Sequence, residues 1–332
     1  MRIGLIDVEA EARGKVTFPN LSLMKISAWH KAQGDTVEWY KPLVSGHMDV
    51  VYMSKVFGDE YTKDYEFPVD ADRVIKGGSG YAISIVDGVE VYDKELDKPL
   101  DSLIDHMMPD YSLYGITDTA YGFLTRGCPR ACPFCHVAKM QGRRVWHNSQ
   151  LGEWWDGQKN IVLLDPNITA SPCFDTYMSM LEHSGAWVDI SQGLDLRLMD
   201  EEKIEALNRV KWKRIHFAWD NPDDDMLPKL KMVMDGLKRA NRRTITVYIL
   251  TNFNSTHEQD LMRVMAVREA GAQPDVRIYR KPTAPKITRQ LARWVNAPNI
   301  FWSVPTFDEY KCCVKDKDKD KGYSGGSQTV LK

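Results

Sequence analysis

Apolar residues in the first hundred positions form short runs that alternate with one longer amphipathic stretch. The run at residues 2–8 is typical of a buried parallel strand. A helix is expected to begin after Pro19 and to end near Gly34. Further strands are expected at residues 36–40, 48–56 and 73–75. Alternating strands and helices predict a small open α/β domain of Rossmann-like type over residues 1–100.

A second, regular alternation begins near residue 121. Strands are predicted at residues 122–127, 160–165, 187–195, 214–220, 244–252 and 275–280. Helices that connect one parallel strand to the next are predicted at residues 201–209, 226–240, 257–270 and 287–295. Six such units predict an α/β fold, a partial (β/α)6 TIM-type barrel over residues 121–310, with an active site at the carboxyl ends of its strands.

Two segments lack this periodicity. The stretch at about residues 86–121 contains two prolines and many acidic residues, and residues 101–120 are expected to form a linker between the domains. Residues 315–332 alternate Lys with Asp and then run through Gly and Ser, which predicts a disordered tail.

Charge gives little indication of a macromolecular partner. The 332 residues carry a formal net charge of -2, which provides no long-range attraction to nucleic acid or to an anionic membrane. Residues 277–293 hold six basic and no acidic residues, which indicates either a solvated helix face or a local nucleic-acid contact. The acidic N-terminus and the lack of an apolar stretch near ~20 residues predict a cytoplasmic protein without a membrane partner.

The most informative stretch is a Cys-x3-Cys-x2-Cys motif directly after a predicted strand. Cys128, Cys132 and Cys135 lie within eight positions, which in a reducing compartment indicates a metal site rather than disulfides. Three thiolates leave one coordination position open. In an iron–sulfur cubane that position is available to a substrate or cofactor, which favours chemistry over a structural role.

Other interpretations of these cysteines stay open. A zinc site would use the three thiolates with His136 or Cys173 as the fourth ligand, although zinc ligands usually come as two separated pairs. Three buried structural cysteines are the other alternative, but the prolines between them exclude a helix interior. Cys173, Cys312 and Cys313 have no regular spacing that would predict a second cluster.

The motif, with the aromatic Phe134 before its last cysteine, resembles the signature of the radical S-adenosylmethionine (SAM) superfamily. The resemblance covers about residues 115–305 and implies a partial (β/α)6 barrel. It implies that Cys128, Cys132 and Cys135 ligate a [4Fe-4S] cluster whose open iron binds the amino and carboxylate groups of SAM, with Phe134 beside the adenine. It also implies reductive cleavage of SAM to a 5′-deoxyadenosyl radical, with electrons from a donor such as flavodoxin or ferredoxin.

Polar residues at two predicted strand ends are candidate SAM ligands. Asp165 and Asn167 stand where the family often has a Gly-Gly-Glu element. A carboxylate there pairs well with an ammonium, while an Asp-Pro-Asn turn is equally a structural connection. Gln192, Asp195 and Arg197 cluster after the next strand, where Arg197 is expected to bind the methionine carboxylate. Its alternative role is a salt bridge with Asp195 that fixes the loop.

The first hundred residues resemble the cobalamin-binding-type domain that precedes the barrel in one large branch of the superfamily. The Asp-x-His-x-x-Gly motif that commonly presents an imidazole to cobalt is absent, because Ala28 precedes His30 and Gly34 follows it at the wrong spacing. The domain is therefore not expected to bind cobalamin, but to shape the substrate pocket or to recognise a partner. The glycine-rich run at residues 77–80 is interpreted as a loop between two strands.

Together these patterns predict a radical SAM enzyme that modifies a small or macromolecular substrate, which the sequence does not identify. One alternative is a methyl or methylthio transferase acting on RNA or protein, which the basic residues 277–293 favour. The other is a non-catalytic iron–sulfur or zinc protein, which would bind metal without binding SAM.

Overall fold

The computed structural model describes the backbone of residues 1–313 and the side chains of residues 1–310. The chain divides into two compact units, Met1–Val162 and Leu163–Lys332. The domain limits expected at residues 100 and 121 remain predictions. The expected tail at residues 315–332 and the side chains of Cys312 and Cys313 lie outside the described residues.

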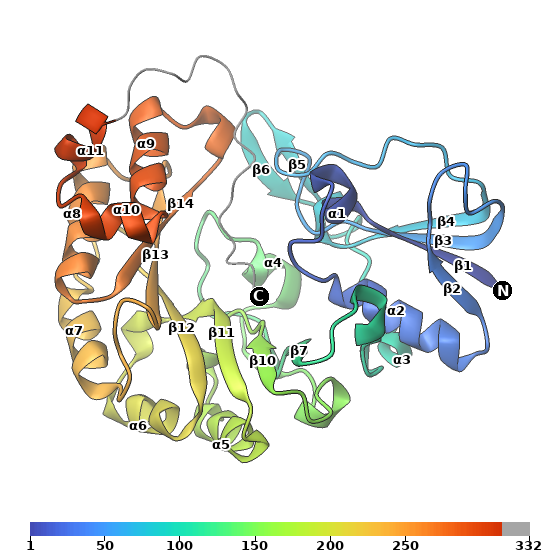
Figure 1. Ribbon diagram of the computed structural model, residues 1–332, viewed down its shortest axis with the longest axis horizontal. Coiled ribbons are helices and arrows are strands. Elements are labelled where there is room, and N and C mark those ends of the chain that lie inside the picture. The colour runs from blue at the N-terminus through green and yellow to red at the C-terminus, as the bar shows by residue number, and fades with distance from the viewer. Residues whose placement is uncertain (314–332) are drawn as a thin grey trace. The chain divides into compact units, whose positions relative to one another are not determined.

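The first unit contains a four-stranded parallel sheet with the strand order β2-β1-β3-β4 (Figure 1). Its strands are β1 (Arg2–Asp7), β2 (Thr36–Trp39), β3 (Met48–Ser54) and β4 (Ala71–Gly77). Helices α1 (Val8–Arg13) and α2 (Leu21–Ala32) lie between β1 and β2 in the chain. Fully buried Ile3 and Leu5 of β1 pack with Leu23 of α2. The strands and the helix predicted for this part of the chain are confirmed.

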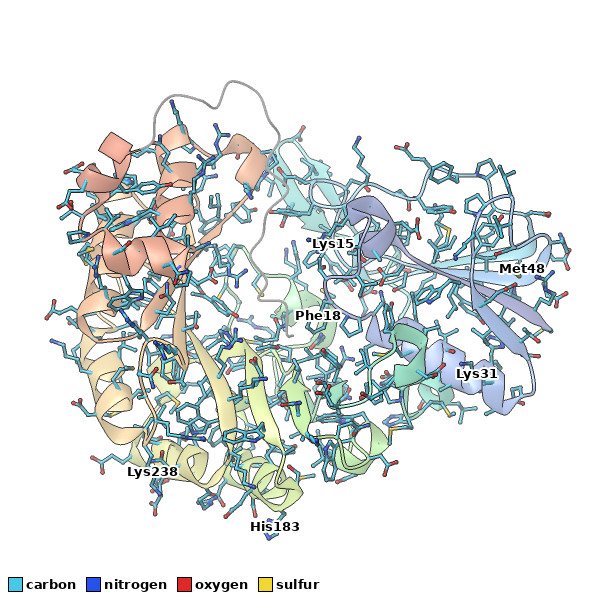
Figure 2. All side chains as sticks on the ribbon, in the orientation of Figure 1. Lys15, Phe18, Lys31, Met48, His183 and Lys238 are labelled. Carbon is cyan, nitrogen blue, oxygen red and sulfur yellow. The ribbon has the colours of Figure 1, made fainter. Side chains whose placement is uncertain are left out.

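Helix α2 begins where predicted and anchors a later segment. The side chain of Asn20 caps it by accepting a backbone N–H of its first turn at 3.2 Å. Lys25 Nζ lies 2.7 Å from Asp105 Oδ1. The Nζ of Lys31, which Figure 2 labels, lies 2.6 Å from Asp110 Oδ2. Residues around Asp105 and Asp110, expected to be a linker, therefore pack as part of this unit and include α3 (Ser102–Asp105).

Residues 83–92 form a β-hairpin that the periodicity did not predict. Strands β5 (Ile83–Val86) and β6 (Val89–Tyr92) pair antiparallel. Asp87 and Gly88 between them have φ of 48° and 77°, as a two-residue type I′ turn requires. Much of both strands is exposed, so no buried apolar run marks them. The start of the aperiodic stretch at about residues 86–121 therefore belongs to a hairpin.

The glycine-rich run after β4 is a close-packed loop. A side chain on Gly78, whose φ is +96°, would overlap the carbonyl oxygen of Lys55. A side chain on Gly80 would overlap the carbonyl oxygen of Phe57. The glycines let this loop pack against the backbone that follows β3. The interpretation of residues 77–80 as a loop between strands is confirmed.

A six-stranded sheet has the order β14-β13-β12-β11-β10-β7. Its strands are β7 (Thr119–Gly122), β10 (Asn160–Leu163), β11 (Trp187–Leu194), β12 (Trp212–Ala218), β13 (Ile245–Thr251) and β14 (Gln273–Ile278). The pairs from β11 to β14 are parallel. The expected strand at residues 122–127 was wrong: the sheet strand β7 ends at Gly122, and β8 (Thr125–Arg126) pairs instead with β9 (Trp146–His147).

Helices follow the strands of this sheet in the pattern expected for parallel crossovers. The main ones are α5 (Phe174–Ser184), α6 (Glu201–Arg209), α7 (Leu227–Gly236), α8 (His257–Glu269) and α9 (Lys286–Val295). Shorter helices are α4 (Val137–Gln141), α10 (Pro298–Ser303) and α11 (Phe307–Cys313). None of the helices within residues 1–313 has both the length and the apolar character needed to cross a membrane.

Candidate functional site

The three cysteines of the motif lie in one loop whose base is closed by contacts within the protein. Strands β8 and β9 pair on either side of the loop. Just inside them, the backbone N–H of Gly127 donates to Gln141 Oε1 and that of Cys128 donates to the carbonyl of Gly142, both at 3.1 Å. Gly127 has a φ of +86°, and a Cβ there would overlap the carbonyl oxygen of Arg144. Glycine is therefore required at this closure.

Cys128, Cys132 and Cys135 are half-buried, and none of them forms a disulfide. The backbone N–H of Cys135 donates to the carbonyl of Cys132 at 3.0 Å, so the second half of the motif is a tight turn, with half-buried Phe134 inside it. Three thiols on a short loop, partly open to solvent, are the donor set of a cubane cluster with one open iron. The residues present fit the cluster that the motif implies.

The described side chains assemble neither a zinc site nor an iron–sulfur site. Among the described side chains, no three His, Cys, Asp or Glu residues are placed to bind a single metal ion. A zinc ion needs ligands that converge on one point, whereas a cubane attaches each cysteine to a different iron atom. His136 Nε2 lies 3.3 Å from Glu90 Oε2. Cys173, the other possible fourth ligand, is exposed.

A carboxylate–imidazole contact joins the cysteine loop to the β5–β6 hairpin. The side chains of His136 and Glu90 are 12% and 10% exposed, so the contact is largely sheltered from water. The ring of Tyr92 lies 6.3 Å from that of His136. Because His136 directly follows Cys135, the hairpin restrains the chain next to the third cysteine. No sequence signal pointed to this contact, since Glu90 and His136 are 46 positions apart.

In the second unit, Asp165 and Asn167 follow β10 as predicted, and both are buried. Asn167 stands directly before a 3-10 turn, Ile168–Ala170. Thr169 Oγ1 in this turn accepts the backbone N–H of Asp195 at 3.1 Å. The loops after β10 and β11 are therefore joined, so the candidates predicted at these two strand ends are neighbours.

The ion pair considered as the structural role of Arg197 is present. Arg197 Nε donates to Asp195 Oδ1 at 2.7 Å, and Nη2 donates to Oδ2 at 3.3 Å. Asp224 Oδ2 lies 3.7 Å from Nη1. The Arg197 side chain is 36% exposed. Gln192 is exposed on an irregular part of β11 and forms no hydrogen bond with Asp195 or Arg197 within the described residues.

Asp220, just after β12, is a further candidate that the sequence pattern did not single out. Burial raises the pKa of Asp220 from 3.8 to about 6, although the charges of Arg197 and Arg263 act to lower it. Arg263 of α8 is fully buried and donates to three backbone carbonyls around the ends of β12 and β13. It also donates to Asp260 Oδ1 at 2.6 Å. A half-buried acid with a shifted pKa at the strand ends is a candidate ligand group.

Two solved structures resemble this chain over most of its length. Both are structures of TsrM, a radical SAM methyltransferase from Kitasatospora setae: one with cobalamin and a [4Fe-4S] cluster, the other with tryptophan substrate and the SAM analogue aza-SAM. Their TM-scores are 0.56 and 0.57 at 11% identity, and the matches cover 83% and 84% of this chain and 72% of TsrM. This chain therefore shares the α/β fold of that enzyme. The sequence matches no protein-family model and no curated protein.

The comparison also concerns cobalamin. Because TsrM binds cobalamin, the expectation that this chain lacks it is not supported. His30, the histidine considered for cobalt, is buried. Its Nδ1 lies 2.7 Å from Asp35 Oδ2, and its Nε2 lies 3.0 Å from the Tyr52 hydroxyl. These contacts argue against His30 as a cobalt ligand and leave binding of cobalamin through other contacts open.

Proposed function

We propose that this chain is a radical SAM enzyme that binds a [4Fe-4S] cluster through Cys128, Cys132 and Cys135 and modifies an unidentified substrate. The observation that carries the proposal is the closed three-cysteine loop in a chain with the fold of TsrM. When bound, the cluster supplies the electron that splits SAM into methionine and a 5′-deoxyadenosyl radical. The six-stranded sheet with its helices would form the partial (β/α)6 barrel, and a cytoplasmic flavodoxin or ferredoxin would deliver the electron.

The residues at the strand ends of the second unit would hold the methionine part of SAM. Asp165 and Asp195 supply carboxylates for its ammonium group, and Asn167 supplies an amide on the same joined loops. Arg197 would bind the SAM carboxylate, and its ion pair with Asp195 would hold the guanidinium in place. Phe134 would contact the adenine, and exposed Gln192 would lie at the rim of the site.

Anaerobic reconstitution with iron and sulfide tests this function. The reconstituted full-length protein is reduced in the presence of SAM, and 5′-deoxyadenosine is measured by mass spectrometry. A variant with Cys128→Ala, Cys132→Ala and Cys135→Ala should hold no cluster and form no product. Cys173→Ala, which removes an exposed cysteine outside the motif, should behave like the unmodified protein. A fully reconstituted cluster that never yields 5′-deoxyadenosine would refute the proposal.

Methyl transfer is a second candidate reaction, because the fold matches a cobalamin-containing methyltransferase. The basic residues 277–293 would then serve an RNA or protein substrate, as considered from the sequence. Equilibrium dialysis of the full-length protein against hydroxocobalamin, followed by absorbance, measures whether the chain takes up cobalamin. Saturable binding of one equivalent of cobalamin would favour methyl transfer. Absence of cobalamin binding would favour a radical SAM reaction without methyl transfer.

A further inference from the structure

The β5–β6 hairpin is anchored to the four-stranded sheet of the first unit. A 3-10 turn, Ser79–Tyr81, connects the glycine-rich loop after β4 to β5. In this turn the backbone N–H of Gly80 donates to the carbonyl of Lys55, directly after β3, at 2.9 Å. Where the two strands of the hairpin meet the turn, the backbone N–H of Asp93 donates to the carbonyl of Ala82 at 2.8 Å. The base of the hairpin is therefore fixed to the sheet.

Strand β6 buries its polar residue and exposes its apolar ones, the reverse of the usual arrangement. Val89 and Val91 are 57% and 40% exposed, whereas the side chain of Glu90 between them is only 10% exposed. Because successive side chains of a strand point to opposite faces, Glu90 shares the sheltered face with half-buried Tyr92. Burying a carboxyl group is unfavourable unless it finds a partner. On this face the partner is His136.

The imidazole of His136 is held by a single hydrogen bond. Its Nε2, 3.3 Å from Glu90 Oε2, makes the one hydrogen bond that the described part of the chain gives this side chain. Its Nδ1 is buried and has no hydrogen-bond partner among the described residues. A buried nitrogen without a partner is unfavourable, so a ring that was free to turn would bring Nδ1 to water. The position of the ring is therefore set by Glu90.

His136 connects this contact to both ends of the cysteine loop. It directly follows Cys135, so the Cα atoms of the two residues are about 3.8 Å apart. Its carbonyl accepts the backbone N–H of Met140 at 2.9 Å, which belongs to the first turn of α4. Helix α4 ends at Gln141, whose Oε1 accepts the backbone N–H of Gly127 at the base of the loop. A displacement of His136 would therefore move the third cysteine and disturb the closure of the loop.

We propose that Glu90 is a positioning residue for the [4Fe-4S] cluster: it fixes His136 and thereby restrains the chain at Cys135, which supports ligation by the third thiolate. This inference rests on the proposed function and deepens it, because it assigns to the N-terminal sheet and its hairpin the support of the cluster loop. Groups that hold the ligands of a metal site commonly control how firmly the metal is bound. The carboxamide of glutamine can accept the same N–H from His136, whereas alanine cannot.

The test measures how firmly the cluster is held. The full-length protein is reconstituted with iron and sulfide, and transfer of iron to the chelator EDTA is followed anaerobically by the loss of cluster absorbance. Glu90→Ala should lose its cluster about fivefold faster, the effect of one hydrogen bond. The electron paramagnetic resonance spectrum of its reduced cluster should also change. Glu90→Gln should restore both properties. Glu95→Ala, which removes an exposed glutamate just after the hairpin, should match the unmodified protein.

A double substitution shows whether Glu90 acts through His136. In the His136→Ala variant, which should already lose its cluster faster, Glu90→Ala should have no further effect. Three results would overturn the inference: additive effects of the two substitutions, an unchanged rate of cluster loss in Glu90→Ala, or a Glu90→Gln variant as impaired as Glu90→Ala. If Glu90→Ala no longer unfolds cooperatively in urea, His136→Ala and Glu90→Gln give the same two readouts.

Failure of the radical function is distinguishable from failure of this inference. A loaded protein that forms no 5′-deoxyadenosine, while Glu90→Ala still loses its cluster faster, would refute the radical function alone. A Glu90→Ala variant with the spectrum and the rate of cluster loss of the unmodified protein would refute the positioning role alone. Uptake of no cluster by the unmodified protein would refute both.

Discussion

Asp220 makes the stability of this protein depend on pH in a way that one substitution can isolate. Burial raises the pKa of this carboxyl from 3.8 to about 6 in the folded protein. Between these values the folded chain keeps a proton that the unfolded chain releases, so this group lowers stability as pH rises through that window. Below pH 3.8 this group does not change the stability, and above about pH 6 its destabilising effect is fully present. Each tenfold change in proton affinity is worth about 1.4 kcal/mol.

Asp220→Asn removes this ionisation and should stabilise the protein. With the pKa at about 6, the variant should gain about 3 kcal/mol in free energy of unfolding at pH 8 but only about 1.5 kcal/mol at pH 5. Urea unfolding followed by tryptophan fluorescence measures both, with the unmodified protein at the same pH as reference. Asp223→Asn, at an exposed position nearby, should change neither value. A gain that is the same at both pH values, or a loss, would refute the reasoning.

Three further substitutions test the site and its support. Arg197→Ala should weaken SAM binding about tenfold or more, measured by equilibrium dialysis, while the iron content stays constant. The control Arg209→Ala, which removes an arginine that is equally exposed at 36% and also ion-paired, should leave SAM binding unchanged. Loss of iron along with SAM binding would make Arg197 structural. Gly127→Ala should prevent cluster uptake, measured as bound iron and sulfide, while Gly152→Ala, where a Cβ meets nothing, should take up a normal cluster. Arg263→Met should lower the free energy of unfolding by about 3–5 kcal/mol, because it leaves buried Asp260 unpaired, and a change under about 1 kcal/mol would contradict this.

The parts of the fold that could be predicted are those whose burial follows a regular period. Strand β13 shows this, because fully buried residues alternate with half-buried ones between Ile245 and Ile249. The hairpin β5–β6 was missed because its strands are exposed, although Asp87 and Gly88 form a recognisable two-residue hairpin signal. The two-residue strands β8 and β9 are too short to produce any period.

The residues of the candidate site also differ in whether a local sequence pattern predicts them. The cysteines are visible in the sequence because their chemistry depends on local spacing, which one loop provides. The contact of His136 with Glu90 depends on a pairing across 46 positions, and the raised pKa of Asp220 depends on burial by residues far away in the chain. Neither property is encoded in a local pattern. The assignments of Asp165, Asn167, Gln192, Asp195 and Arg197 to SAM therefore remain predictions.

The closed base of the cysteine loop also determines how the cluster would be assembled. The β8–β9 ladder and the hydrogen bonds of Gly127 and Cys128 involve protein groups only, so their formation requires no iron. The conformational entropy of the loop is then largely lost in folding rather than in cluster insertion. Cluster insertion would then require little further ordering of the loop's base, and the protein without iron should resist proteolysis there nearly as well as the loaded protein.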